Sequence, residues 1–240
     1  MKTSNKILLS TLLAIFLIFI GIHIALYAKY KSGDFTVATD DFMSNDTTTL
    51  KPVRFVKVTG MDNLVIVPSS GFAITKQKKM PGYFKYAEVG DTLFITGDTS
   101  TYRNNNELVK RRMHETVWLH LPSIEMISAE NTAIHLLGAR DSAAAINTNV
   151  LLSSASLFVQ PQAADTTMFF GKLSVQARDG SEFIFSDNPS NVSQVACELR
   201  NSKIQDAPSA SIGTLSIRAD QQSTVQLNGN NLRKLTSITP

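Results

Sequence analysis

Two histidines flank a short apolar run and are the first candidates for metal chemistry. His114 and His120 lie six residues apart in "HETVWLH", and this even spacing places both side chains on one face of a strand. A zinc site needs three or four ligands, and no third ligand is evident beside the pair. His135 alternates with Ile134 and Leu136, so its ring faces outward. We interpret these histidines as solvated or locally hydrogen-bonded, and we expect no metal site.

Paired carboxylates hydrolyse glycosides in most glycosidases, so the acidic residues of the chain are candidates for this chemistry. The candidates are dispersed along the chain: Glu125, Glu130, Asp179, Glu182 and Asp220. Glu130 and Asp179 occupy equivalent bends of a repeat, two coils apart, which corresponds to about 10 Å at the usual strand spacing. That distance is near the separation of some hydrolytic pairs. Acidic residues are also ordinary turn formers, so we expect no catalytic residue here.

The remaining sequence signals favour structural roles over enzymatic ones. No Gly-x-Ser-x-Gly elbow, phosphate loop or His-Glu-x-x-His helix occurs in the sequence. Cys197 is the only cysteine, which excludes an internal disulfide, and its apolar neighbours in "QVACEL" predict a buried side chain. We therefore predict a protein that is not an enzyme and that binds no cofactor.

Two basic clusters offer contacts with anionic lipid. They consist of Lys76, Lys78 and Lys79 in "KQKK", and of Lys110, Arg111 and Arg112 in the longest polar insertion, "DTSTYRNNNELVKRRMHE". A basic residue near a charged membrane contributes about 1 kcal/mol to binding. We prefer the reading in which these residues form solvated loops and protect an exposed sheet edge.

Composition and charge exclude two further classes of protein. With 43% apolar residues, the 240-residue chain is not mainly disordered. The formal net charge is +3, but Lys2, Lys6, Lys29 and Lys31 precede every acidic residue, which leaves about −1 on the rest. The body therefore lacks the basic surface expected of a nucleic-acid-binding protein.

An apolar run near the N-terminus predicts a membrane anchor. Residues Ile7–Tyr27 carry no charge and would span roughly 30 Å as a helix. We assign residues 1–6 to a short tail and 7–28 to a transmembrane anchor in contact with the lipid bilayer. A cleaved signal peptide is the alternative, although the site after Ala28 fits cleavage poorly. The lysines on the two sides nearly balance, and the short tail favours a cytoplasmic N-terminus with the body outside the cytoplasm.

Beyond the anchor, the apolar spacing predicts strands. Residues 29–51 are polar and read as a tether, and residues 52–240 form the head. Apolar residues in the head recur at spacings of two, as in Val56 and Val58, or Leu93 and Ile95, which is typical of β-strands with one buried face.

One two-strand phrase occurs at least three times. "GKLSVQARDGSEFIF" and "GTLSIRADQQSTVQL" start 42 residues apart, at Gly171 and Gly213, and "SIEMISAENTAIHL" has the same internal spacing. Strand pairs start near residues 124, 150, 173, 195, 215 and 235, a step of roughly 20 to 26 residues that indicates a solenoid. An antiparallel β-sandwich is the alternative, but it does not explain a repeated phrase.

The sequence resembles a known family of membrane proteins. The features that carry the resemblance are the anchor running into "ALYAKYKSGDFT", the opening "FVKVTGMDNLVIVPSSGFAITKQ" and the phrase "VWLHLPSIEMISAENTAIHLLG". They are similar to single-span envelope proteins of the Bacteroidetes type with a GIN domain, provisionally named as an auto-transporter adhesin head. The resemblance implies an all-β, right-handed β-solenoid and carries over no catalytic residue.

These observations together predict a non-enzymatic envelope protein. We expect a single-pass membrane protein whose β-solenoid head acts outside the cytoplasm as an adhesin-like binding or structural module. A polysaccharide or a protein of the envelope would be its partner. The alternatives are a carbohydrate-active β-helix enzyme and an accessory subunit of an envelope complex.

Overall fold

The computed structural model contains two units, an N-terminal helix and a β head, which divide after Met43. The structure describes residues 3–32, 45–61, 63–77, 84–97, 101–104, 107–110, 116–160 and 167–239. The helix α1 spans Thr3–Ser32. Its segment Leu9–Lys29 is long and apolar enough to cross a membrane.

The polar groups of α1 suit this apolar helix. Lys29 and Lys31 occupy the last turn, where positive charge is favourable near the helix C-terminus. His23 is the one strongly polar side chain within the apolar run, and its Nδ1 lies 2.9 Å from the carbonyl oxygen of Phe19. This contact gives the ring nitrogen a hydrogen-bond partner within the helix itself. The prediction of one long apolar N-terminal helix is confirmed.

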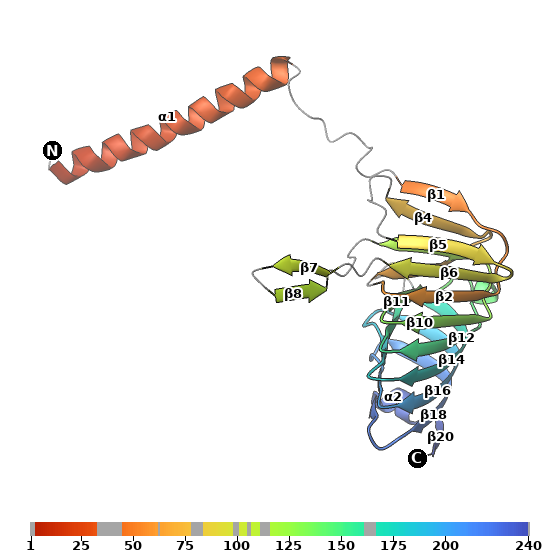
Figure 1. Ribbon diagram of the computed structural model, residues 1–240. Coiled ribbons are helices and arrows are strands. Elements are labelled where there is room, and N and C mark those ends of the chain that lie inside the picture. The colour runs from red at the N-terminus through yellow and green to blue at the C-terminus, as the bar shows by residue number, and fades with distance from the viewer. Residues whose placement is uncertain are drawn as a thin grey trace. The chain divides into compact units, whose positions relative to one another are not determined.

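The head consists of two nine-stranded sheets that face each other (Figure 1). Sheet A has the order β1 (Asn45–Thr49), β4 (Ala73–Gln77), β9 (Val117–Leu121), β3 (Leu64–Pro68), β11 (Ala133–Leu137), β13 (Ser156–Gln160), β15 (Glu182–Phe185), β17 (Lys203–Gln205) and β19 (Thr224–Gln226). Sheet B has the order β20 (Leu235–Thr239), β18 (Ala210–Ala219), β16 (Ser190–Arg200), β14 (Met168–Arg178), β12 (Thr148–Ser153), β10 (Met126–Glu130), β2 (Phe55–Thr59), β6 (Thr92–Gly97) and β5 (Phe84–Val89). The strands β7 (Thr101–Asn104) and β8 (Glu107–Lys110) pair as a separate hairpin.

Each coil places one strand in sheet B and the next in sheet A, and successive coils pair in parallel. The paired positions in sheet B are separated by 23, 25, 22 and 20 residues: Ile127, Val150, Val175, Cys197 and Ile217. Leu173 pairs with Val195, which pairs with Leu215, so the repeated phrase does recur after two coils. The predicted β-solenoid is confirmed, and its parallel strands exclude the antiparallel sandwich.

The first coils depart from simple chain order. The coil of β2 and β3 lies between the coil of β6 and β9 and the coil of β10 and β11. The chain therefore builds an outer coil second and then returns past the first coil to continue the stack. At this end β5 pairs antiparallel with β6, and β4 pairs antiparallel with β9. These antiparallel strands end the parallel ladder.

The head begins earlier in the chain than expected. Residues Asn45–Thr49 form β1 and pair antiparallel with β4, and α1 continues to Ser32. The tether expected over residues 29–51 is thus shorter, because both of its ends belong to regular elements. Polar Thr, Asp and Asn residues tolerate this edge position because β1 is exposed along its length.

The core is a set of side-chain columns between the sheets. In sheet A one column runs through Leu64, Ile134, Leu157, Phe183 and Ile204, each paired in register with its neighbour and each with 0% of its surface exposed. Leu173 and Leu215 are buried, Val225 packs against the core, and Lys172, Gln176, Thr214 and Arg218 are exposed. Inward and outward positions thus alternate along the repeated phrase, as its period-two spacing predicts.

The bends between the two sheets repeat as well. Asn131, Ser154, Asp179 and Asn201 follow the sheet B strands of four successive coils, and all have positive φ angles between 46° and 61°. Asn and Asp tolerate this left-handed conformation better than most residues. The hydroxyl of the next residue, as in Thr132 and Ser202, donates at 2.9 Å to the carbonyl of the last residue of the strand. The polar stretches between the two strands of a phrase, such as "ARDGS", thus form backbone corners.

The glycines that open the repeated phrase stand where neighbouring coils approach closely. A Cβ atom at Gly213 would lie 2.5 Å from the carbonyl oxygen of Ser193, and one at Gly171 would lie 2.3 Å from the Asn147 side chain. Both glycines stand at the one pair that is missing from the ladders of the long strands β14, β16 and β18, whose register is the same on either side. The repeated glycine therefore reflects a lack of space.

A polar network closes the C-terminal end. The short helix α2 (Gly229–Leu232) carries Asn231, which is fully buried. Its Nδ2 donates to Asp206 Oδ2 at 2.9 Å and to the Ala210 carbonyl at 2.8 Å, while its Oδ1 accepts from the Ile212 N–H. Asp206 also accepts two N–H bonds from Asn228. This network satisfies backbone groups that the last coil leaves without a strand partner.

The column register predicts a sharp contrast between two substitutions. Phe183→Ala should lower the free energy of unfolding by about 3–5 kcal/mol, because the ring is fully buried. Gln176→Ala, on the exposed face of the neighbouring strand, should change it by no more than about 0.5 kcal/mol. Denaturant unfolding of both variants measures this, and similar losses from the two would contradict the register.

Candidate functional site

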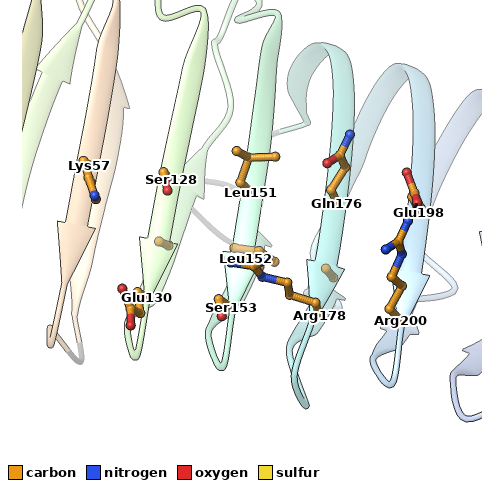
Figure 2. A pocket seen from close by; sticks show the side chains of 12 residues that line it. Lys57, Ser128, Glu130, Leu151, Leu152, Ser153, Gln176, Arg178, Glu198 and Arg200 are labelled. Atoms are coloured by element: carbon orange, nitrogen blue, oxygen red, sulfur yellow. Dashed lines mark hydrogen bonds and ion pairs between the residues drawn. The ribbon is translucent and has the colours of Figure 1, made fainter.

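A groove crosses the outer face of sheet B, over five successive strands from β2 to β16 (Figure 2). Its volume is about 370 Å³. Because side chains alternate along a strand, the core columns leave a second set of columns facing outward. One of these aligns Ser128, Leu151, Gln176 and Glu198, each from a different coil. The groove is therefore built from residues that are far apart in sequence and adjacent only in the stack.

Charged side chains gather at one end of these strands. Arg178 and Arg200 pair in register on β14 and β16, and their side chains are 70% and 73% exposed. Arg200 donates to Glu198 Oε1 at 2.7 Å. Figure 2 shows Arg178 extending over β12, next to Ser153. Two guanidinium groups thus lie on adjacent strands, and only one of them has a carboxylate of the groove within hydrogen-bond distance.

The structure does not align Glu130 with Asp179. Glu130 is in register with Ser153 and Arg178, whereas Asp179 follows one position later, in the bend. The expected equivalence of the two carboxylates is therefore wrong by one residue. Asp179 has a positive φ of 61°, accepts from Ser153 Oγ at 2.9 Å and lies 3.4 Å from Arg178 Nε. These contacts are those of a turn residue.

Two other candidate carboxylates are engaged in structural contacts. Arg54 donates to both oxygens of Glu125, at 2.6 and 2.8 Å, and this hydrogen bond holds the pKa of Glu125 below its ordinary value. Asp220 accepts from Ser223 Oγ at 2.6 Å and from two backbone N–H groups. These hydrogen bonds lower the pKa of Asp220, and the bond from Ser223 has the largest effect. Glu182 stands in register with Lys203 on the outer face of sheet A. The predicted acids are thus dispersed over separate places.

Two of the three candidate histidines, His120 and His135, face outward, as predicted. His120 and His135 are both half-buried on the outer face of sheet A, and His114 lies outside the described residues. Among the residues that the structure describes, no three His, Cys, Asp or Glu side chains form a group that could hold a metal ion. Cys197 is buried, as expected, and burial raises the pKa of its thiol.

The outer face of sheet A carries an apolar column that the sequence reasoning did not identify. Paired residues on successive strands are Trp118, Val65, His135, Phe158 and Ile184. The rings of His135 and Phe158 stack at 4.9 Å between centroids. Period-two spacing predicts which residues face outward, but register between coils decides which of them become neighbours.

Of the basic clusters, the described part contains Lys76 and the backbone of Lys110. The Lys76 ammonium lies 6.0 Å from the centre of the Phe84 ring, which fits a cation–π contact. Lys78, Lys79, Arg111 and Arg112 lie outside the described residues, so their predicted roles stay predictions.

No family model and no curated protein matches the chain, so the similarity to the GIN domain stays a resemblance. Several solved structures are similar over most of the chain. A Parabacteroides distasonis protein provisionally named as lipid-binding has 12% identity, covering 76% of this chain and 94% of its own, with a TM-score of 0.35. A Bacteroides fragilis protein provisionally named an adhesin has 12% identity, covering 76% and 95%, with a TM-score of 0.33. A Clostridium sporogenes protein provisionally named a cell adhesion protein has 9% identity, covering 77% and 99%, with a TM-score of 0.29.

His135 predicts a pH dependence of stability. Burial lowers the pKa of its ring in the folded head, so the unfolded chain takes up the proton first as the pH falls below about 6.5. The folded state should therefore lose stability as the pH falls through that value, and the loss should end below the folded pKa. His135→Gln should reduce this slope when unfolding is compared between about pH 8 and about pH 5.5.

Gln160→Ala serves as the control, because it removes the side chain 2.9 Å from His135 Nδ1 and keeps the ring. This variant should keep a slope of the same sign. Parallel stability curves for the wild type and His135→Gln would show that the ring does not contribute.

Proposed function

We propose that this protein is a non-enzymatic, membrane-anchored binding module whose head acts outside the cytoplasm. The observation that carries the proposal is the groove on sheet B, because it crosses five coils at right angles to the strands. Such a groove suits an extended chain that passes from coil to coil. Its lining combines amide, hydroxyl, carboxylate and guanidinium groups, which recognise hydroxyl and carboxyl groups of a polysaccharide or a protein segment.

The pair Arg178 and Arg200 is the expected specificity element of the groove. Guanidinium groups bind carboxylates through two parallel hydrogen bonds, and exposed arginines on adjacent strands present two such forks to one ligand. The ligand expected here is an acidic envelope polymer, either a uronic-acid polysaccharide or an acidic protein segment.

The non-enzymatic part of the proposal rests on the engagement of the acids. A working site needs an acid and a base or nucleophile within reach of one another. Glu125 is bound to Arg54, Glu198 to Arg200, and Asp220 to its own bend. Each of these carboxylates accepts a hydrogen bond from a neighbouring side chain, and the bond either stabilises the fold or orients an arginine.

The anchoring part of the proposal rests on α1. Its segment Leu9–Lys29 has a mean hydropathy of 2.5 and the length of a membrane span. In this reading α1 is retained as a signal anchor in the lipid bilayer, and the head is displayed in the cell envelope.

A binding experiment tests the groove. The full-length protein in detergent should bind at least one member of an array of acidic polysaccharides and acidic peptides. The double variant Arg178→Gln/Arg200→Gln should bind at least about tenfold more weakly, because hydrogen bonds to charged groups contribute about 1.5–3 kcal/mol. Lys172→Gln is the matched control, since Lys172 is exposed on the same strand but does not line the groove.

Two results would contradict the binding proposal. One is equal binding by the wild type and the double arginine variant. The other is release of sugar products from the array polysaccharides that Glu130→Gln abolishes, which would favour the carbohydrate-active enzyme.

A protease experiment tests the topology. Protease added to intact spheroplasts should digest the head, because the proposed orientation places it outside the cytoplasm. The N-terminal sequence of the membrane-bound protein should begin before α1. A head that stays full-size and protected would overturn the orientation, and an N-terminus at Lys29 would show cleavage.

A further inference from the structure

The exposed large apolar side chains of the head are not evenly distributed. Among the described residues of the head there are four of them: Tyr86 (39% exposed), Val89 (62%), Phe94 (38%) and Leu232 (53%). The first three lie on the neighbouring strands β5 and β6, and Leu232 lies on α2 near the other end of the stack. Clustered exposed apolar groups mark an interaction surface more often than single ones do. We call the surface of Tyr86, Val89 and Phe94 the β5 edge.

The β5 edge is the end of sheet B, since β5 pairs with β6 and is the last strand in the order of that sheet. Phe94 pairs with Ala87, so Phe94 and Val89 share the outer face. Tyr86 points to the opposite face, where its ring lies 6.2 Å from that of Phe84. The edge therefore presents apolar groups on both faces, beside the charged Lys85 and Glu88 of the same strand.

Lysines surround these apolar groups. Lys85 stands on the outer face of β5, and Lys57 is in register with Phe94 on the next strand. Lys76 lies above the Phe84 ring on the opposite face. Two acids also lie nearby: Glu88 accepts the Lys51 N–H at 3.4 Å, and Asp91 lies 3.9 Å from Arg54. Aromatic and lysine side chains together are typical of the interface between a bilayer and water.

The chain attaches the head to the anchor at this same end. The strand β1 begins at Asn45 and pairs with β4, which pairs with β9, and β9 belongs to the same terminal coil as β6. Twelve residues separate Asn45 from Ser32, the end of α1, and a chain of that length extends at most about 45 Å. When α1 is in a bilayer, the length of this segment therefore limits how far this end of the head can lie from the membrane surface.

We infer that the β5 edge docks onto the headgroup layer of the bilayer that holds α1, with Val89, Phe94 and Tyr86 at the depth of the headgroups and Lys85, Lys57 and Lys76 next to lipid phosphates. The occupant is anionic phospholipid. This inference rests on the anchor of the proposed function, and it adds that the head lies on the membrane by one end. The groove then leads away from the membrane, since Lys57 lines its near end and Arg200 its far end.

Fluorescence in nanodiscs tests this docking. The full chain, with a cysteine introduced as Val89→Cys, is labelled with an environment-sensitive dye and placed at one copy per disc. Cys197 is buried with a raised thiol pKa, so the introduced cysteine is the one that reacts under native conditions. Leu232→Cys is the matched control, because Leu232 is similarly exposed but lies on α2.

A spin-labelled headgroup lipid should quench the dye at position 89 several-fold more than the dye at position 232. The quenching should increase with the fraction of phosphatidylglycerol in phosphatidylcholine discs, and Lys85→Gln/Lys57→Gln should reduce that increase. Equal quenching at both positions would overturn the docking.

The dye at position 89 could instead be as strongly shielded from water in lipid-free detergent as in discs, and only at high protein concentration. That result would also overturn the docking and would assign the β5 edge to a second copy of the chain. Failure of the chain to enter discs would instead contradict the anchor, so the two failures are distinguishable.

Discussion

The structure depends on one constraint, that the backbone of each coil must pair with the same positions of the coils on both sides. Buried N–H and C=O groups need partners, and in a parallel stack those partners come from a neighbouring coil in fixed register. Any feature of one coil is therefore imposed on the next. This explains the left-handed bends at Asn131 and Asp179 and the hydroxyls of Thr132 and Ser202, which recur although the residue types change. The strands that follow the bends can pair in register only if all coils turn at the same position.

The same constraint explains how much could be predicted from the sequence. Inward columns were predictable because Leu173 and Phe183 alternate with polar residues, and the glycines at 171 and 213 repeat because neither site has room for a Cβ atom. The order of the first coils was not predictable, since apolar alternation does not say which strands pair. The strand β1 was missed because its sequence "NDTTT" is polar on both faces. The strand is held by its backbone ladder with β4 and by a hydrogen bond of 2.9 Å between the Thr47 and Thr75 hydroxyl groups.

The two ends of the stack show two physical solutions to one problem. Each end leaves unpaired backbone groups and exposes the core columns, so repeat proteins need caps. At the N-terminal end, an antiparallel strand pairs with the last parallel strand of each sheet. At the C-terminal end, Asn231 enters the core and bonds to Asp206 and to backbone groups of the last coil. Neither apolar spacing nor strand alternation predicts that Asn231 is buried. Its role can be recognised only when the structure of the last coil is known.

Candidate sites follow from what folding leaves free. Packing and backbone geometry restrict the residue types of the inward columns and the bends. At outward positions, any residue type that is compatible with a β-strand is allowed. Like charges directly opposite on adjacent strands are destabilising. Arg178 and Arg200 are such a pair, so their positions are not explained by the stability of the stack. Glu198 relieves part of that repulsion by its contact with Arg200. Asp179, which lies 3.4 Å from Arg178 Nε, relieves another part. Both arginine side chains nevertheless stay largely exposed, so an acidic group placed between them would add to this relief. The charge of a ligand should therefore have its greatest effect on binding at the arginine pair.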